Sequence, residues 1–332
     1  MTEDDGADSD RYERYAEQFD PSWSDRPARR GRKPQARPDA RKSQSQVVAE
    51  LAEPSGLEAG FVTTYHPARY EAEWLLSSLR TFYDEHLISD VLAQVKGGKE
   101  ASVYRCSADP TTGAALLAAK VYRPRMFRNL RNDKIYRDGR AILTADGRPV
   151  KKTDHRIMRA VGKKTAFGAQ VQHTSWVMYE FTTMRRLHRA GAAVPRPHAV
   201  SENAILMDYY GDERRAAPTL NEVGLASDQA GPLFQEVLRN IELMLQHGLI
   251  HGDLSAYNML YWEGRIVIID FPQITDIHTN RQAAFILQRD ITRVCEYFAR
   301  HGVRCDPAAI MEDLWLRYGE VVSDEAEEMQ EP

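Results

Sequence analysis

An ordered set of polar residues in the second half of the chain has the composition of a phosphoryl-transfer site. The stretch 251–258 (HGDLSAYN) places Asn258 five residues after Asp253, and Asp270 ends the apolar run that begins at Arg265. Transfer of a phosphoryl group from a magnesium nucleotide needs a carboxylate that positions the acceptor hydroxyl and oxygen ligands that hold the metal. We therefore predict that Asp253 is catalytic and that Asn258 and Asp270 bind the metal.

Each of these residue types also has an ordinary structural use, since aspartate caps turns and asparagine satisfies loop backbone. The ordered set favours the catalytic interpretation over three unrelated turn residues. Segments 259–262 and 265–269 are predicted strands joined by a Glu263-Gly264 turn, so both metal ligands flank one hairpin.

A nucleotide site of this kind also needs a lysine on a strand, for the α- and β-phosphates, and a helical glutamate that holds the lysine. Lys120 interrupts the apolar run 116–122, a pattern typical of a buried strand with one inward cation. Apolar residues at 177, 181, 184 and 187 recur at helical spacing around Glu180. We predict that Lys120 is catalytic and binds nucleotide with Glu180 as its partner, although an acid beside a core face is also often solvated.

A phosphate loop is expected before the Lys120 strand, where segment 95–104 reads VKGGKEASVY. It has neither three spaced glycines nor the Walker pattern. The backbone amides of Gly97 and Gly98, with Lys99 and Ser102, are the candidate phosphate contacts. Two adjacent glycines also suit a plain hairpin turn.

In a nucleotide site of this kind, adenine lies beside a short connection between two lobes of the fold. The segment 204–211 is predicted to be a buried strand that ends at this connection. Met207 is the predicted gatekeeping side chain beside the adenine site. Tyr209 and Tyr210 are predicted to line the adenine slot, with ordinary core packing as the alternative. A helix is predicted at 233–246, where its apolar face repeats every three to four residues and Gly248 ends it.

Four segments together resemble the RIO family of atypical protein kinases: GGKEASVY at 97–104, AAKVY at 118–122, HGDLSAYNML at 251–260 and IDFPQ at 269–273. The resemblance extends over about residues 75–300 and is strongest to the first RIO subgroup, of bacterial or archaeal type. Gly97 stands where the family usually has Ser or Thr, and Gly252 where the first subgroup often has Ala. Because Gly97 has no side chain, Lys99 and Ser102 are left to supply a side-chain contact to phosphate.

The resemblance implies an α+β, two-lobed protein-kinase-like fold of reduced RIO type. A small β-rich N-lobe is expected at about 85–207 and a mainly helical C-lobe at about 208–322, without a long activation segment. The sequence agrees, because only residues 271–332 follow Asp270 and they contain no Ala-Pro-Glu. The family implies ATP with Mg²⁺, or Mn²⁺ in its place, and phosphorylation of protein serine or threonine, including serine of the chain itself.

Two other functions stay open. By resemblance, Asp270 can accept phosphate itself, which would make the chain an ATPase switch that gates binding to a ribosomal or RNA-rich particle. Small-molecule phosphotransferases also combine His-Gly-Asp with a metal-binding asparagine, but the Gly-Lys-Glu loop argues against that class.

Composition separates the predicted kinase domain, 61–322, from two tails. Residues 1–60 are predicted to be a disordered tail with a basic run at 26–42, and 323–332 an acidic disordered tail. From 120 to 164 there are fifteen Lys or Arg against four Asp, whereas the whole chain has a net charge of −4. Segments 26–42 and 120–164 are expected to contact ribosomal RNA or a ribosomal particle, with solvated flexible segments as the alternative.

The remaining composition excludes several classes. No uninterrupted apolar run approaches a membrane span, and no charged and apolar leader begins the chain. The three cysteines, Cys106, Cys295 and Cys305, lack metal-ligand spacing. We expect a cytoplasmic protein with reduced thiols and no membrane partner, whose protein substrate the sequence does not identify.

Overall fold

The computed structural model describes residues 61, 63–98, 100–123, 136, 140–151, 153–163 and 165–319. The predicted tails at 1–60 and 323–332 lie outside the described residues, as do Lys99, the basic segment 26–42 and part of 120–164. No helix in the described part is long and apolar enough to cross a membrane.

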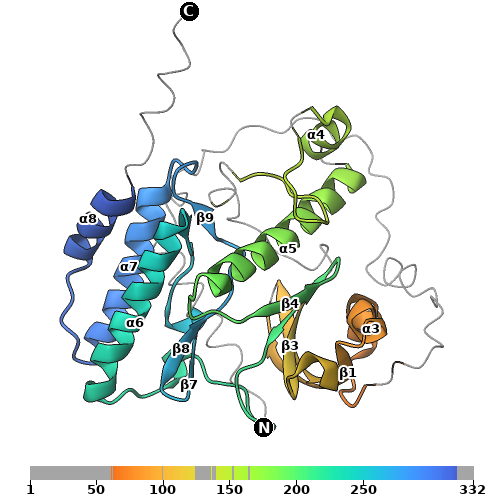
Figure 1. Ribbon diagram of the computed structural model, residues 1–332, viewed down its shortest axis with the longest axis horizontal. Helices are drawn as coiled ribbons and strands as arrows, with labels where there is room; N and C mark the ends of the chain where they lie inside the picture. Colours follow the sequence, from red (N-terminus) through yellow and green to blue (C-terminus); the bar gives the residue numbers. More distant parts are fainter. Residues whose placement is uncertain are drawn as a thin grey trace, which may run out of the picture. The chain divides into compact units, whose positions relative to one another are not determined.

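A five-stranded antiparallel sheet forms the N-lobe, with strand order β1-β2-β3-β5-β4 (Figure 1). The strands are β1 (Ile88–Gly97), β2 (Ala101–Ala108), β3 (Leu116–Tyr122), β4 (Pro197–Val200) and β5 (Ala204–Asp208), and the 3₁₀ turn η2 (Pro110–Thr112) lies between β2 and β3. The strand predicted around Lys120 is therefore the central strand of this sheet.

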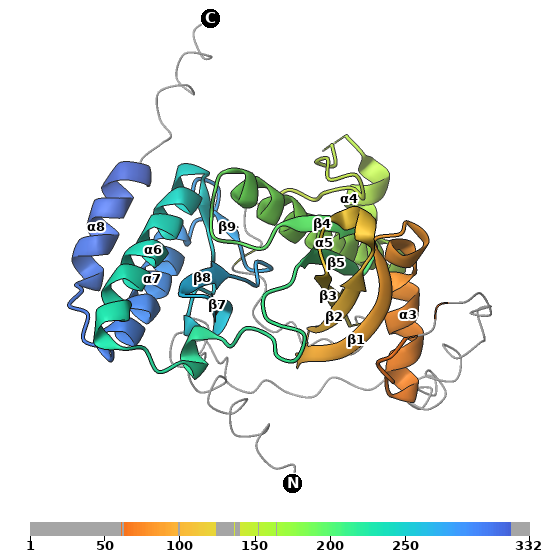
Figure 2. The ribbon, with the colours of Figure 1, turned by 60° about the horizontal axis from the view of Figure 1, so that its bottom comes forward.

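Two helices, α3 (Arg69–Asp84) and α5 (Ala166–Arg189), pack on opposite faces of the sheet (Figure 2). Side chains alternate between the two faces of a strand. Leu117 and Val121 of β3 belong to the apolar cluster of α3, whereas Ala118 and Tyr122 belong to the cluster that includes α5. Lys120 therefore lies on the face that α5 covers, and α3 extends the N-lobe before its predicted start near residue 85.

The C-lobe is mainly helical. Its helices are α6 (Ser227–Gln246), α7 (Ala283–Ala299) and α8 (Pro307–Tyr318), and α4 (His155–Gly162) precedes α5. Short two-stranded sheets pair β6 (Leu249–Ile250) with β9 (Thr275–Asp276) and β7 (Met259–Trp262) with β8 (Arg265–Ile268), and the 3₁₀ turns are η4 (Leu220–Glu222) and η5 (Ala256–Asn258). The predicted two-lobed α+β fold is confirmed.

Two local predictions are confirmed with adjusted bounds. The β7–β8 hairpin turns at Glu263 and Gly264, whose φ angles of 50° and 79° suit a tight turn with positive φ at both residues. Helix α6 ends at Gln246 as predicted but begins before residue 233 and contains Pro232. The prediction started after Pro232 because proline disfavours helix interiors, yet the helix accommodates it within its first two turns.

Candidate active site

A cluster of charged side chains joins β3 of the N-lobe to the C-lobe. The ammonium Nζ of Lys120 lies 2.7 Å from Glu180 Oε1 and 2.6 Å from Asp270 Oδ1. Lys120 projects from β3, Glu180 from α5, and Asp270 follows β8. The structure thus brings together three predicted site residues that are far apart in the sequence.

Burial and pairing act in opposite directions on the charges of this cluster. Burial lowers the pKa of the Lys120 ammonium, but the carboxylates of Asp270 and Glu180 outweigh burial and hold that pKa well above its ordinary value. Burial likewise raises the pKa of Asp270, and Lys120 outweighs it, so the pKa of Asp270 is lowered. Lys120 and Asp270 are therefore both charged at neutral pH, as a phosphate-binding cation and an anionic ligand must be.

The Glu180 carboxylate is held at both oxygens. Oε1 accepts from Lys120 and, at 3.4 Å, from the backbone N–H of Phe271, and Oε2 accepts a hydrogen bond from the Tyr122 hydroxyl. Lys120 and Tyr122 are two positions apart on β3, so they reach Glu180 from the same face. Sequence analysis missed Tyr122, although an aromatic residue two positions after the lysine was the available signal.

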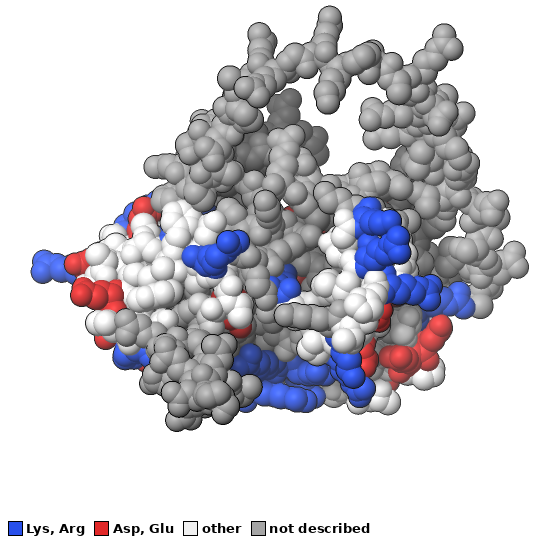
Figure 3. Space-filling model, turned by 90° about the horizontal axis from the view of Figure 1, so that it is seen from above, with Lys and Arg blue, Asp and Glu red and all other residues white. Residues whose placement is uncertain are grey.

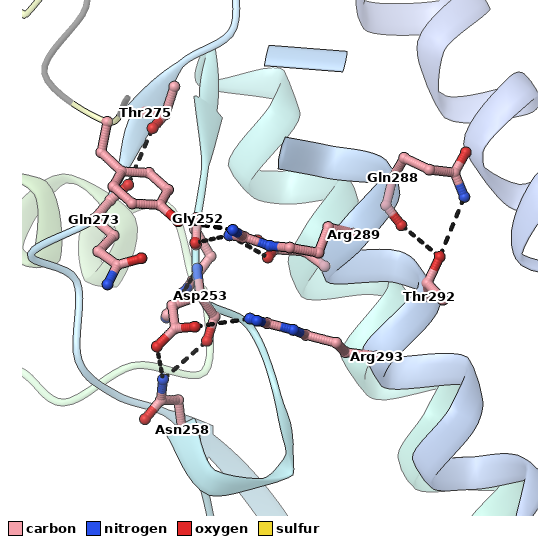
Figure 4. Close-up of polar contacts among 12 residues, drawn as sticks. Gly252, Asp253, Asn258, Gln273, Thr275, Gln288, Arg289, Thr292 and Arg293 are labelled. Atoms are coloured by element: carbon pink, nitrogen blue, oxygen red, sulfur yellow. Dashed lines mark hydrogen bonds and ion pairs between the residues drawn. The ribbon is translucent and has the colours of Figure 1, made fainter. Parts of the chain in front are cut away.

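The loop that carries Asp253 is fixed by side chains on both sides (Figure 4). Asn258 Nδ2 donates to the Asp253 carbonyl oxygen at 2.8 Å and to Asp253 Oδ2 at 3.1 Å. Arg293 Nη1 lies 2.8 Å from Asp253 Oδ1. His251 Nε2 lies 3.1 Å from the carbonyl oxygen of Ile269, which ties the loop to the end of β8.

Helix α7 supplies three buried charged residues that sequence analysis missed. The Asp290 carboxylate accepts from the backbone N–H of Gly252 at 2.8 Å, Arg289 donates to the Gly252 carbonyl oxygen, and Arg293 reaches Asp253. Arg293 is four positions after Arg289 and three after Asp290, and residues three and four positions apart share one side of a helix. The signal was a charged Arg-Asp-x-x-Arg group within the largely apolar run 283–299.

Gly252 has a backbone conformation that suits glycine. Its φ is +85°, a left-handed value, and a Cβ on Gly252 would overlap the carbonyl oxygen of Gln273. This backbone conformation therefore explains why residue 252 is glycine here, at a position where the first RIO subgroup often has alanine.

Asn258 and Asp270 have the atoms that a divalent cation prefers. The backbone N–H of Ile269 donates to the Asn258 carbonyl oxygen at 3.0 Å, which places Asn258 beside the residue that precedes Asp270. The amide nitrogen of Asn258 donates to Asp253, and the side-chain oxygen of Asn258 and the Asp270 carboxylate are of the type of ligand that Mg²⁺ prefers. Among the described residues no group of three His, Cys, Asp or Glu could hold a metal. An ion at Asn258 and Asp270 would therefore complete its shell with phosphate oxygens and water.

The predicted phosphate loop is the hairpin between β1 and β2. Ser102 pairs with Val121, whereas its neighbour Val103 pairs with Lys120. Residues opposite each other on paired strands share a face, so the side chain of Ser102, only 1% exposed, lies on the face opposite Lys120. The geometry argues against the predicted phosphate contact by the Ser102 hydroxyl, because strand alternation turns it toward α3.

The predicted adenine-site residues follow β5. Met207 pairs with Ala118, two positions from Lys120 on β3, so Met207 and Lys120 share the face covered by α5. Met207 is buried, and the partly buried Tyr209 donates from its hydroxyl to the Asp212 carbonyl oxygen at 3.2 Å. Burial raises the pKa of Tyr210. The adenine contacts of Met207, Tyr209 and Tyr210 stay predictions.

These features define a two-lobed, protein-kinase-like fold with a lysine–glutamate pair between strand and helix. Residues 104–310 match the family model of the RIO domain. The chain therefore belongs to the RIO family. Membership implies the use of ATP and a divalent metal in general terms.

Curated relatives carry the same family name. The chain is 29% identical over 231 residues to the serine/threonine-protein kinase RIO1 of Chaetomium thermophilum, a match that covers 66% of this chain and 41% of that protein. It is 35% identical over 139 residues to the RIO-type serine/threonine-protein kinase Rio1 of Haloferax volcanii, which covers 42% of this chain and 47% of the relative. The corresponding protein of Thermoplasma acidophilum is 33% identical over 137 residues, 41% of this chain and 70% of that protein. The chain thus spans less than half the length of the first two relatives.

Proposed function

We propose that this chain is an ATP-dependent serine/threonine protein kinase that transfers the γ-phosphoryl group to protein serine or threonine, including serine of its own. The observation that carries the proposal is the buried Lys120 ammonium in contact with both Glu180 and Asp270. This cation would bind the α- and β-phosphates, while Glu180 fixes its position. The names of the curated relatives support the same function.

Asp253 is the proposed acceptor-orienting residue. Its carboxylate is held by Asn258 and Arg293, so one acceptor hydroxyl can be directed at the γ-phosphorus. Because the transition state of phosphoryl transfer is loose, orientation matters more than strong general-base catalysis. A divalent cation, Mg²⁺ or Mn²⁺, bound by Asn258 and Asp270 would neutralise charge on the phosphate oxygens.

A second candidate function is an ATPase switch that passes phosphate to Asp270 and gates binding to an RNA-rich particle. The short connection from Asp270 to α7, residues 271–282, favours it, because it leaves little chain to support a peptide acceptor.

Incubation of the chain with γ-labelled ATP and Mg²⁺ separates these functions. Acid-stable label on serine or threonine that disappears in Asp253→Ala would support the kinase. Label recovered only as free phosphate, or as a hydroxylamine-labile adduct at Asp270, would support the switch. The matched control is Asp228→Ala, which removes an exposed carboxylate from the start of α6. No turnover at all would refute both functions.

We further propose an RNA-rich partner, ribosomal RNA or a ribosomal particle, for the basic segments. Within 120–164, Arg156 and Arg159 are exposed on α4, and outside that segment Arg185, Arg186 and Arg189 add exposed cations on α5. In Figure 3, groups of Lys and Arg side chains occupy the face that is seen from above. Such a surface favours a polyanion through counterion release.

A further inference from the structure

Arg293 contacts the proposed acceptor-orienting residue from a distant part of the chain. It lies on α7, forty residues after Asp253, and its Nη1 is 2.8 Å from Asp253 Oδ1. The side chains of Arg293 and Asp253 are 7% and 13% exposed. The ion pair is therefore largely removed from water.

The two oxygens of Asp253 have different partners. Arg293 donates to Oδ1, and Asn258 donates to Oδ2 at 3.1 Å (Figure 4). A carboxylate on a single methylene rotates about two side-chain bonds, and a donor at each oxygen opposes both rotations. The planar guanidinium is suited to this task because its donors are fixed in one fork.

Stability alone is a weak reason for an ion pair at this position. Removing two charges from water is costly, and replacing a buried pair by apolar residues is often neutral or stabilising. Arg289 and Asp290, one turn before Arg293 on α7, are also buried and charged, and both contact the backbone of Gly252. The buried charges on this side of α7 are therefore directed at the loop that carries Asp253, and Arg293 contacts that loop at its carboxylate.

We infer that Arg293 is a positioning residue for phosphoryl transfer: it fixes the rotamer of Asp253, and through Asp253 the direction of the acceptor hydroxyl. This inference rests on the proposed function. Arg293 acts on the acceptor side of the site, whereas Lys120 and Glu180 lie on the nucleotide side. Loss of Arg293 therefore lowers kcat and leaves the KM for ATP unchanged. Misplacement of a reacting group by about 1 Å costs about 10²-fold in rate.

The test compares Arg293→Met, Arg293→Lys and the unaltered chain in rates of transfer from γ-labelled ATP. Arg293→Met is expected to lower kcat about 10²-fold with the KM for ATP within about twofold, and Arg293→Lys to recover about tenfold because it keeps a cation. The matched control is Arg300→Met, which removes an exposed arginine at the end of the same helix and should leave both constants unchanged. Thermal unfolding of each variant identifies any that does not fold.

The same change in an Asp253→Asn chain separates positioning from a structural role. If Arg293 acts through Asp253, Arg293→Met or Arg293→Lys causes no further loss of the residual rate in that background. An equal loss in both backgrounds, or a rise in the KM for ATP that matches the fall in kcat, would overturn the inference. If the unaltered chain turns over and the Arg293 variants have the same rates as Arg300→Met, the inference about Arg293 is overturned while the proposed function stands. An unaltered chain that neither transfers nor hydrolyses would overturn the proposed function as well.

Discussion

Tyr122→Phe tests whether the site depends on a second residue of β3. The change removes only the hydroxyl that donates to Glu180 Oε2. The ring keeps its edge-on contact with Trp176, at 4.8 Å between centroids. Burial and the nearby Glu180 raise the pKa of Tyr122 well above its ordinary value, so in the unaltered chain the hydroxyl stays protonated and donates.

The expected loss follows from the burial of Glu180, which is 2% exposed. A hydrogen bond to a charged group contributes about 1.5–3 kcal/mol, and removing its donor leaves a buried oxygen unsatisfied. We expect the free energy of unfolding to fall by about 2 kcal/mol, which lowers Tm by about 4–8 °C for a domain of this size. If half of that free energy is expressed in nucleotide binding, the Kd for ATP rises about fivefold.

The assays are thermal unfolding and titration with ATP, with Tyr179→Phe as the matched control. Tyr179 is a partly buried tyrosine of α5 that stacks with Arg140, and its hydroxyl makes no hydrogen bond to the residues that the structure describes. The control should leave Tm and the Kd for ATP nearly unchanged. A Tyr122→Phe chain that matches the control in both quantities would refute a role of Tyr122 in holding Glu180.

Three other changes test separate parts of the chain. Burial raises the pKa of Asp208, but the nearby His198 and the backbone N–H of Arg196 together outweigh burial and lower it. The resulting stability is present above about pH 3.9 and lost as pH falls through the lowered pKa. In Asp208→Asn, the urea concentration at the midpoint of unfolding should therefore fall less steeply as the pH is lowered. A pH dependence parallel to that of the unaltered chain would contradict this. Gly264→Ala places a Cβ at φ +79° and should cost about 1 kcal/mol in urea unfolding, whereas Gly231→Ala inside α6 should gain about as much; equal effects would refute the turn argument. Replacing Arg123, Arg125, Arg128 and Arg131 by alanine should flatten the salt dependence of RNA binding, and binding that is insensitive to salt would exclude this partner.

Local sequence patterns predicted the parts of the site whose structure depends mainly on neighbouring residues in the sequence. A lone lysine in an apolar run indicated β3, and a Glu-Gly turn between two short apolar runs indicated the β7–β8 hairpin. These predictions succeeded because strand alternation and turn conformation are properties of neighbouring residues. The pairing of Lys120 with Glu180 was predicted because a nucleotide site of this kind needs a lysine on a strand and a glutamate on a helix.

The sequence was least informative where tertiary pairing decides the position of a side chain. The face on which Ser102 lies depends on the register between β2 and β3, in which Val103 rather than Ser102 opposes Lys120. A single strand cannot encode that register, because its alternation has two possible phases. Arg293 was missed for a related reason, since a charged residue in a helix is usually solvated and only the packed structure buries it against the Asp253 loop.

The hydrogen bonds from α7 to the Gly252 backbone restrict the motion of the loop that carries Asp253. The N–H of Gly252 ends on Asp290 and its carbonyl oxygen on Arg289, so the loop cannot detach from α7 without exposing buried charges. Loop and helix should therefore open to hydrogen exchange as one cooperative unit. A ligand that binds only the ordered loop would slow amide hydrogen exchange along α7 without contacting that helix. A substitution that destabilises α7 would in turn weaken the binding of that ligand to the loop.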